Sequence, residues 1–487
     1  MPFPFANTYA RLPETFFARV DPTPVSAPQL IAINSDLASD LGIAAGLLNG
    51  DDACAFLSGN RIPEGAEPLA MAYSGHQFGG FSPQLGDGRA ILLGEVVGRD
   101  GRRRDIQLKG SGPTPYSRRG DGRSALGPVL REYLVSEAMA ALGVPTTRAL
   151  AAVSSGDRVY REEMEPGGVF TRVASSHLRI GTVEYFASRG DHVNLRVLAD
   201  YVIERHYPEA KEAENTALAL LEGVIARQAS LVAHWMQFGF IHGVMNTDNM
   251  SLSGETIDYG PCAFLDQYDP AKKFSFIDQQ GRYAFGNQPK IAHWNLTRLA
   301  ESLLPLLATD EDAAIELAKE ALGTFPDQFR SAHLSRMAAK IGIEKGGEHD
   351  WPLVDSLLQL MQDQEADFTL TFRHLRRAAT GDQESFLKRF PRRAPVIEWL
   401  AAWHHHLQDS NISAEIAAST MRQANPVFIP RNHRIEEVIQ AGKQGDFGPF
   451  HRFLEVLQHP FEEQLASSDY ENPPEPHERV RATFCGT

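Results

Sequence analysis

Hydrophobic positions recur with the period of a β-strand in one part of the chain and with the period of a helix in another. Residues 90–96 and 105–109 are strand-like segments separated by a polar turn, which predicts a β-hairpin. Residues 148–153 and 159–161 also alternate, and residues 154–157 are the predicted turn between them. This part of the chain is therefore predicted to be rich in β-structure.

A single amphipathic helix is predicted within the β-rich part, at residues 128–142. Pro128 occupies its first turn, Leu130 and Leu134 are in helical register, and Gly143 follows its end. From about residue 195 onward the pattern is mainly helical. This order of elements predicts an α+β protein with two lobes of different class.

Composition and charge narrow the functions that such a chain can have. Its 487 residues are 43% hydrophobic and 22% charged, a globular balance, and the net charge of −15 disfavours nucleic acid and membranes as partners. Three cysteines without a Cys-x-x-Cys pair indicate a reducing compartment, and the N-terminal residues resemble neither a signal peptide nor a transit peptide. The uncharged segment 228–247 is too polar for a membrane span. We therefore expect a cytoplasmic protein.

Candidate phosphate-binding residues lie around the predicted hairpin. The turn before its first strand contains Gly86 and Gly88, where missing side chains let backbone N–H groups approach phosphate oxygens. Lys109 ends the second strand and resembles the lysine that neutralises phosphates in kinases. Either Glu132 or Glu137, on the following helix, could hold this lysine in an ion pair. Taken singly, each feature also suits an ordinary β-turn, a surface lysine or a solvated helix face.

A stronger signal lies in the helical part, at residues 242–249 (HGVMNTDN) and 257–260 (IDYG). His242 and Asn249 match the kinase pattern His-Arg-Asp-x-x-x-x-Asn, and Asp258-Tyr-Gly matches Asp-Phe-Gly. Asn249 and Asp258 would then supply oxygen ligands to a divalent cation that bridges phosphates. Together the motifs predict a kinase-like, nucleotide-handling fold.

The kinase pattern lacks its catalytic aspartate in this chain. Val244 occupies that position and cannot accept a proton. Asp248 is the nearby carboxylate able to replace it, so the chain is either an inactive kinase or an enzyme whose base has moved with the reaction.

Two arginines add to the candidate phosphate site. Arg172 and Arg179 lie in the segment FTRVASSHLRIG, which would form the floor of the junction between the lobes. Guanidinium groups bind phosphate through paired hydrogen bonds, and two of them could clamp a buried γ-phosphate. Structural ion pairing is the alternative interpretation.

Several longer strings together resemble one known family. They are residues 73–79 (YSGHQFG), 84–89 (QLGDGR), 107–118 (QLKGSGPTPYSR), 121–123 (DGR), 242–250 (HGVMNTDNM), 258–261 (DYGP), 425–426 (NP), 431–432 (RN) and 472–474 (NPP). In combination they resemble the selenoprotein O (SelO) family of protein adenylyltransferases, from about residue 5 to the end. Strings of this length make chance matching implausible.

The resemblance implies a bilobal protein-kinase-like fold that binds ATP in a flipped orientation. It implies transfer of AMP, rather than phosphate, to Ser, Thr or Tyr hydroxyls of target proteins, with release of pyrophosphate. The implied division is an N-terminal extension (1–65), a β-rich N-lobe with one helix (66–170), a mainly helical C-lobe (171–410) and a helical C-terminal extension with a mobile tail (411–487).

The family's functional residues carry over to matching positions of this sequence. The resemblance implies nucleotide binding by Gly86, Gly88, Arg89, Lys109, Asp121, Gly122, Arg172, Arg179 and Asp258. It implies Asp248 as the catalytic proton acceptor, Asn249 and Asp258 as ligands of Mg²⁺ or Mn²⁺, and Glu132 as the ion-pair partner of Lys109.

Three other interpretations stay open. Bacterial relatives have also been associated with Mn²⁺-supported transfer of UMP from UTP. A small-molecule phosphotransferase similar to aminoglycoside or choline kinases fits the His-Gly start of the motif, although Val244 replaces their aspartate. A non-catalytic nucleotide-binding scaffold is the third. For the adenylyltransferase, the expected partners are ATP and proteins with Ser, Thr or Tyr hydroxyls, redox proteins among them, and we expect a monomer.

Redox control is associated with the resemblance through a cysteine near the C-terminus. Cys485 matches that terminal position, but Phe274 stands where a partner cysteine is expected in the loop after Asp258-Tyr-Gly. Cys262 could replace this partner only if the terminus reaches it, because a disulfide needs Cα atoms within about 7 Å.

Overall fold

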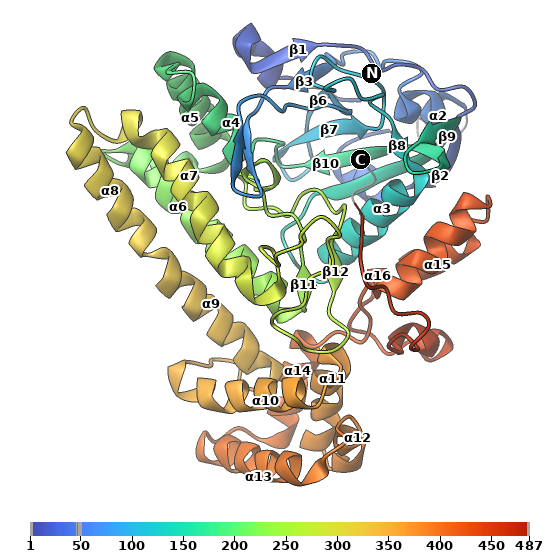
Figure 1. Ribbon diagram of the computed structural model, residues 1–487, viewed down its shortest axis with the longest axis vertical. Helices are drawn as coiled ribbons and strands as arrows, with labels where there is room; N and C mark the ends of the chain where they lie inside the picture. Colours follow the sequence, from blue (N-terminus) through green and yellow to red (C-terminus); the bar gives the residue numbers. More distant parts are fainter. Residues whose placement is uncertain (1–2, 45, 47–50, 485–487) are drawn as a thin grey trace.

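The strands of the large sheet gather at one end of the long axis of the molecule, and the other end is helical (Figure 1). The computed structural model describes residues 3–44, 46 and 51–484. They form a β-sheet with helices against it and a large helical region, as the predicted mixture of α and β structure requires. The helices are α1 (Ser35–Asp40), α2 (Asp51–Ser58), α3 (Leu126–Ala141), α4 (Ile180–Ala187), α5 (His192–His206), α6 (Thr216–Gln237), α7 (Gln288–Leu307), α8 (Glu311–Gly323), α9 (Phe325–Lys340), α10 (Trp351–Asp363), α11 (Phe368–Ala379), α12 (Gln383–Leu387), α13 (Arg393–Asp409), α14 (Ala414–Ala424), α15 (Asn432–Lys443) and α16 (Gly448–Gln458), with short 3₁₀ turns that include η5 (Thr247–Asn249) and η8 (Leu465–Glu471).

The large sheet is antiparallel and has the strand order β1-β3-β6-β7-β10-β9-β2, with β8 paired to β10. Both edge strands, β1 and β2, come from the N-terminal segment, which thereby completes the sheet. Two small sheets pair β4 with β5 and β11 with β12. The strands are β1 (Phe17–Arg19), β2 (Gln29–Ile33), β3 (Leu69–Met71), β4 (Gly75–Gln77), β5 (Gly80–Ser82), β6 (Ala90–Val97), β7 (Arg103–Lys109), β8 (Ser124–Ala125), β9 (Arg148–Tyr160), β10 (Met164–Ala174), β11 (Phe240–Ile241) and β12 (Ala263–Phe264).

The first predicted hairpin is present, because β6 pairs antiparallel with β7. The turn predicted at residues 154–157 is wrong: β9 continues through it, pairs with β10, and the connection lies at residues 161–163. Gly156 has a φ of +76° and packs against Ala27, whose N–H donates to the Ser155 carbonyl at 3.0 Å. The Ser-Ser-Gly-Asp segment is therefore a bulge within one long strand.

Side chains on the central strands β7 and β10 alternate between two faces of the sheet. On one face, Leu108 and Val169 belong to a core that includes residues of α1 and α2. On the other face, Phe170 packs in the core that contains α3. Because strand side chains alternate, Lys109 and Arg172 point to the α3 face. The sheet thus places a lysine and an arginine side by side, opposite a helix.

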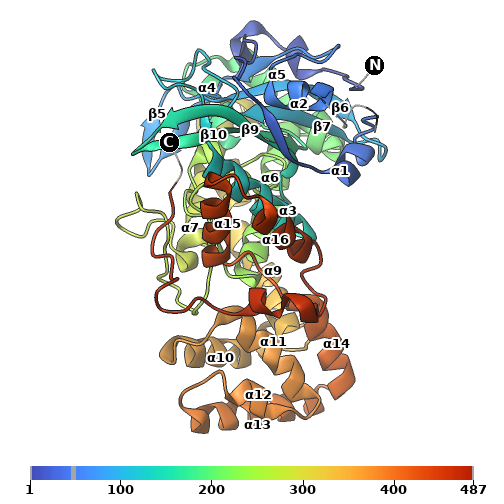
Figure 2. The same ribbon diagram turned by 90° about the vertical axis from the view of Figure 1, so that its right-hand side faces the viewer.

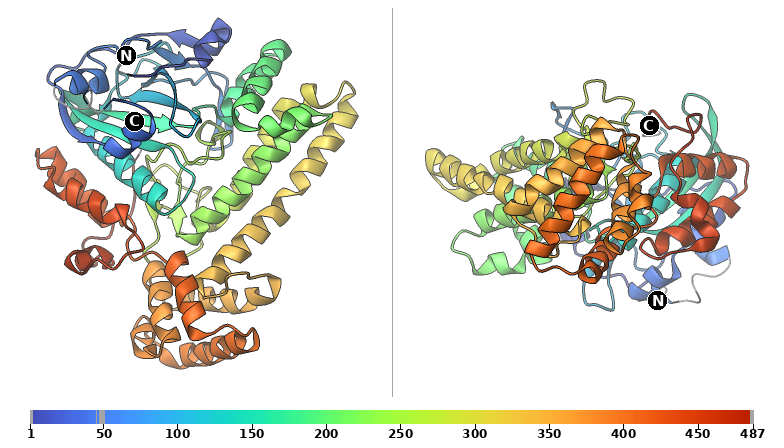
Figure 3. Two further views of the ribbon diagram at one scale, coloured as in Figure 1. Left: turned by 180° about the vertical axis from the view of Figure 1, so that it is seen from behind. Right: turned by 90° about the horizontal axis from the view of Figure 1, so that it is seen from below.

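The helical region runs away from the sheet and then returns to it. Figure 3 shows α6, α7 and α9 running side by side, and α6 packs against both of the others. Helices α10–α14 form the far end around a separate core that includes Trp399 and Trp403. Helices α15 and α16 come back to pack against α3 (Figure 2). The last described residues reach the loop after β12, where Thr483 N donates to the Phe274 carbonyl at 2.8 Å.

Helix α6 has the length and mean hydropathy, 1.3, of a membrane-crossing segment. However, 56% of its most apolar window is buried inside the protein. The core helix of a soluble protein has the same properties, so the length and hydropathy of α6 are weak evidence for a span.

Lys340, the last residue of α9, gives a prediction about pH and stability. It is 1% exposed, and its ammonium lies 4.4 Å from the ring centroid of Phe372. Burial lowers the pKa of Lys340 to about 7, so from about pH 7 to pH 10 the unfolded chain binds the extra proton and stability rises with pH. Allowing for the ring contact, we expect Lys340→Met to raise the free energy of unfolding by roughly 2–4 kcal/mol near pH 7 and about 1 kcal/mol near pH 9.5.

Urea unfolding at the two pH values measures this effect. Lys345→Met, at an exposed position after the same helix, is the control and should change little at either pH. A gain for Lys340→Met that is the same at both pH values would contradict the assignment.

Candidate active site

A buried cluster of alternating charges lies where the sheet meets the helical region. Lys109 Nζ is 2.6 Å from Glu132 Oε2 and 2.7 Å from Asp258 Oδ1. Arg172 Nη1 lies 2.7 Å from the same Asp258 oxygen, and Arg179 Nη1 lies 3.1 Å from Oδ2. Three cations thus converge on one carboxylate, which is the aspartate of the Asp-Tyr-Gly motif.

Strand register brings the basic residues together. In the pairing of β7 with β10, Lys109 is opposite Phe170 and Gln107 is opposite Arg172. The Arg172 side chain therefore crosses to Gln107, whose Oε1 accepts from Nη2 at 2.7 Å. Glu132 projects from α3 onto this face and lies 3.3 Å from Arg172 Nη1.

Of the two glutamates proposed from sequence, the structure places Glu132 at Lys109. Glu137, one and a half turns further along α3, accepts from Arg148 Nη2 at 2.7 Å and from the Ala149 backbone N–H at 2.8 Å. Glu137 therefore attaches α3 to the start of β9.

The three cations control the ionisation of Asp258. Burial alone would raise its pKa, but Lys109, Arg172 and Arg179 outweigh this effect and hold the pKa of Asp258 well below the ordinary value. The residue also has a φ of +65°, in the left-handed region that non-glycine residues rarely adopt. Such backbone strain gathers at functional sites, where the surroundings hold the residue in place.

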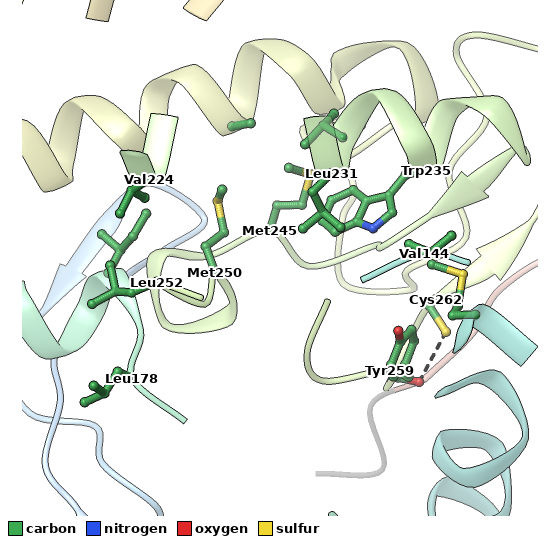
Figure 4. Packing of buried hydrophobic residues seen from close by; sticks show 14 of the residues in the cluster. Val144, Leu178, Val224, Leu231, Trp235, Met245, Met250, Leu252, Tyr259 and Cys262 are labelled. Carbon is green, nitrogen blue, oxygen red and sulfur yellow. Dashed lines mark hydrogen bonds between the residues drawn. The ribbon is translucent and has the colours of Figure 1, made fainter. Parts of the chain in front are cut away.

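Apolar side chains anchor the loop that follows β11 in the core. Met245 and Met250 are buried in the core with residues of α6 such as Leu231 and Trp235 (Figure 4). From α7, Asn295 Nδ2 donates to the Met245 carbonyl at 2.9 Å. These contacts fix the loop that carries the candidate base.

Asp248 lies in the 3₁₀ turn η5, at the centre of this loop. It is 7% exposed, and its burial raises the pKa to about 6 even though Arg179 and Gln77 act in the opposite direction. Arg179 Nη1 donates to the Asp248 carbonyl at 2.7 Å and so joins the base loop to Asp258. Val244, at the position of the kinase aspartate, is 5% exposed and offers only its carbonyl, which accepts from Asn249 Nδ2 at 3.0 Å.

The oxygen atoms of this loop suit a hard divalent cation. Asn249 donates its amide N–H to the Val244 carbonyl, so its amide oxygen is the atom it can offer to a cation, and Asp258 brings a carboxylate held in the ionised form. Mg²⁺ is commonly held by one or two protein oxygens together with substrate phosphates. Among the residues that the structure describes, no cluster of three or more His, Cys, Asp or Glu side chains could hold a metal ion by itself. The residues therefore fit a cation shared with a nucleotide.

The glycine turn forms a rim above the charged cluster. Gly86 has a φ of +77°, and a Cβ there would lie 2.4 Å from the ring of Tyr116. A Cβ on Gly88 would lie 3.0 Å from the Tyr116 carbonyl oxygen. The Arg89 carbonyl accepts from the Gly110 N–H at 2.7 Å, next to Lys109. The turn therefore needs its glycines to pass under the loop that follows β7.

The remaining two candidates lie further out on that loop. Asp121 is half-exposed, and Arg161 Nη1 lies 3.0 Å from its carboxylate. Gly122 has a φ of +65°, and a Cβ there would lie 2.1 Å from the Gly112 carbonyl. The structure thus places these two residues at the rim and not within the ion-pair cluster.

Only one of the two candidate redox cysteines lies among the described residues. Cys262 is buried, and its thiol donates to the Tyr259 carbonyl at 3.3 Å (Figure 4). Cys485 lies outside the described residues. Thr483 Oγ1 donates to the Pro261 carbonyl at 2.6 Å, so the chain does reach the neighbourhood of Cys262.

Sequence reasoning missed several residues that hold the cluster together. Asp87, between the two glycines of the turn, lies 3.7 Å from Arg179 Nη2 and accepts from Gln107 Nε2 at 3.1 Å. His177 Nε2 accepts from Arg172 Nε at 3.2 Å. The place of Gln107 in the cluster had a sequence signal, because strand alternation puts it on the same face as Lys109, two residues away. The contacts of Asp87 and His177 depend on tertiary packing.

Comparison with known proteins identifies the family. The family model described as "Protein adenylyltransferase SelO" matches residues 2–458. Curated relatives named "Protein nucleotidyltransferase YdiU" are 60% identical over 484 residues in Agrobacterium fabrum (99% of each chain) and 59% identical over 489 residues in Rhizobium rhizogenes (100% of this chain, 97% of the relative). The one from Rhodopseudomonas palustris is 58% identical over 488 residues, covering 100% of this chain and 99% of its own. The chain therefore belongs to the protein adenylyltransferase SelO family.

Proposed function

We propose that this protein transfers AMP from ATP to Ser, Thr or Tyr hydroxyls of target proteins and releases pyrophosphate. The observation that carries the proposal is the convergence of Lys109, Arg172 and Arg179 on Asp258, beside a loop whose kinase aspartate is replaced by Val244. Membership of the family described as protein adenylyltransferase supports the reaction class.

The same arrangement supports a kinase-like, two-lobe organisation. Lys109, Arg172 and Glu132 come from the sheet and α3, whereas Asp248 and Asp258 come from loops of the helical region. We assign the sheet part to an N-lobe and the helical part that follows it to a C-lobe, with the nucleotide bound between them; because β10 runs to Ala174, the boundary lies after that strand and not at residue 170. Of the two extensions, the first contributes β1 and β2 to the sheet, and the second contributes α15 and α16, which pack on α3.

In this proposal the cations that now hold Asp258 bind the β- and γ-phosphates. Lys109 and Arg172 are buried, so their charges act on phosphate oxygens with little screening by water. Asn249 and Asp258 would hold Mg²⁺ or Mn²⁺, which when bound neutralises the charge that develops on the leaving pyrophosphate. Enclosing the outer phosphates leaves the α-phosphorus as the centre that an acceptor reaches.

Asp248 is the proton acceptor of the proposed reaction. The acceptor hydroxyl oxygen bonds to the α-phosphorus, its proton moves to the Asp248 carboxylate, and the bond from the α-phosphorus to the bridging oxygen breaks. The electron pair of that bond leaves with pyrophosphate. Both the protein–AMP ester and pyrophosphate are thereby accounted for.

Paired labelling experiments test the proposal. The full-length protein is incubated with Mg²⁺ or Mn²⁺ and dephosphorylated casein as the acceptor, with ATP labelled at the α-phosphate in one arm and at the γ-phosphate in the other. We expect label in casein only from the α-position. An Asp248→Asn protein serves as the blank. Transfer from the γ-position alone would establish ordinary kinase chemistry instead, and a parallel arm with α-labelled UTP separates AMP from UMP transfer.

A further inference from the structure

The small hairpin β4–β5 is docked onto the loop that carries Asp248. The His76 N–H donates to Thr247 Oγ1 at 2.7 Å, and the Phe78 N–H donates to Asn246 Oδ1 at 3.1 Å. At the base of the hairpin, the Ser74 N–H donates to the Gly181 carbonyl at 2.9 Å. Backbone groups of β4 and its flanks thus bind both the loop and the start of α4.

Two residues of β4 face Asp248 directly. Gly75 and Gln77 are two apart on a strand, so they point to the same side. Gln77 Nε2 donates to Asp248 Oδ2 at 3.2 Å. A Cβ on Gly75 would lie 2.7 Å from Asp248 Oδ1 and 3.0 Å from Asp248 Cβ, closer than side-chain atoms pack. Gly75 is not among the residues with a left-handed backbone, so the need for glycine there is a need for space.

Strand β4 provides the contacts that orient the Asp248 carboxylate. Oδ1 is buried and has no hydrogen-bond partner among the described residues. The hydrogen bond from the Gln77 amide and the missing side chain at Gly75 therefore set the orientation of the carboxylate.

The side chain of His76, between these two residues, holds the strand in place. His76 points the other way, where its Nδ1 lies 2.5 Å from Glu184 Oε1 on α4. Glu184 Oε2 in turn accepts from Thr247 Oγ1 at 2.5 Å. Strand, helix and base loop are thus joined through one buried carboxylate, which makes β4 a rigid support.

We propose that Gln77 and Gly75 are positioning residues that orient the Asp248 carboxylate for the acceptor hydroxyl, one by its amide and the other by its missing side chain. This inference rests on the proposed function, in which Asp248 takes the proton. A methyl group at position 75 must rotate or displace the carboxylate, because Asp248 Oδ1 would be its nearest atom, at 2.7 Å, with Asp248 Cβ and Leu85 Cδ1 both at 3.0 Å. Nucleotide binding, which uses other residues, is expected to persist.

The glycine pair on the hairpin provides a matched test. Gly75→Ala should lower kcat for transfer of α-label from ATP to casein about 50-fold or more, with the KM for ATP changed less than about 2-fold. Gly80→Ala is the control, because a Cβ there would meet only the Gln77 carbonyl, at 3.5 Å, and its kcat should equal that of the unchanged protein. A Gly75→Ala protein with full kcat, or one that loses ATP affinity instead, would overturn the inference.

Two variants of Gln77 separate positioning from structural support. Gln77→Met keeps the length of the side chain without its N–H donor, and kcat should fall about 10-fold. Gln77→Glu keeps the shape but sets a second carboxylate beside Asp248, and kcat should fall about 100-fold. A residue that only packs would give equal losses for both variants, together with lower melting temperatures. If the unchanged protein itself transfers no α-label, the proposed function fails; if it does and these variants match it, the positioning role alone fails.

Discussion

Replacing Asp258 with alanine is expected to lower nucleotidyl transfer about a thousandfold or more. The carboxylate contacts Lys109, Arg172 and Arg179 at 2.7, 2.7 and 3.1 Å, and it is also the candidate metal ligand. Its removal takes away the proposed metal ligand and the carboxylate that aligns the three cations proposed to bind phosphate. Transfer of α-label from ATP to casein measures the loss.

The same substitution is expected to separate nucleotide binding from catalysis. Without Asp258, the carboxylates left in ion pairs with the three cations are, among the described residues, Glu132 and Asp87, and breaking such a largely buried ion-pair cluster costs about 3–5 kcal/mol of stability. Metal-free ATP brings negative charge to those cations, so it should raise the melting temperature of Asp258→Ala more than that of the unchanged protein.

Asp312→Ala, an exposed aspartate on α8, is the control and should leave activity and melting temperature unchanged. An Asp258→Ala protein that keeps more than about a tenth of the activity would remove Asp258 from the chemistry.

The charge pattern explains how three cations can lie together inside the protein. Lys109, Arg172 and Arg179 are all nearly buried, and isolated buried cations are costly. Glu132, Asp87 and Asp258 neutralise them in the structure, with Asp258 contacting all three. In the proposed function a nucleotide would compete with this internal carboxylate for the three cations, so Asp258 would both neutralise the cations and bind the metal.

The local part of this site was predictable from sequence. The hairpin β6–β7 follows from alternation, and the ion pair of Lys109 with Glu132 uses a strand end and a helix that both have clear sequence signals. Helical periodicity alone left Glu132 and Glu137 open, because the choice depends on how α3 is rotated against the sheet, whereas the family resemblance implied Glu132, which the structure confirms. Arg148 at the start of β9 takes the second glutamate.

Contacts between distant segments were beyond sequence reasoning. Nothing local indicates that Gln77 meets Asp248, since Gln77 lies in strand β4 and Asp248 lies in η5, 171 residues later, and the docking of β4 brings them together. The turn expected at residues 154–157 failed for the same reason. Its composition is typical of a turn, but pairing with β10 and packing of Ala27 against Gly156 keep the chain extended.

The motif at residues 431–432 has a structural role, and the second large effect is expected from a substitution in it. Arg431 is 1% exposed and lies 2.7 Å from Asp266, after β12, and 2.9 Å from Asp367, which caps α11. Its Nε also donates to the Glu471 carbonyl at 3.1 Å, at the end of η8. One guanidinium thus joins the loop after the Asp-Tyr-Gly motif, the far helices and the C-terminal segment.

Arg431→Leu is therefore expected to lower the free energy of unfolding by about 3–5 kcal/mol, because it leaves two buried carboxylates without their cation. The melting temperature measures the loss, and limited trypsin digestion should show faster cleavage within residues 459–484. Arg393→Leu, at the start of α13, is the control: its pair with Glu384 is half-exposed at 3.0 Å, and its removal should cost less than about 1 kcal/mol. Equal effects of the two substitutions would mean that Asp266 and Asp367 are neutralised by something other than Arg431. Because Asp266 follows the metal-ligand motif by eight residues, a destabilised Arg431→Leu protein that retains its kcat would further show that this anchor supports the fold and not the chemistry.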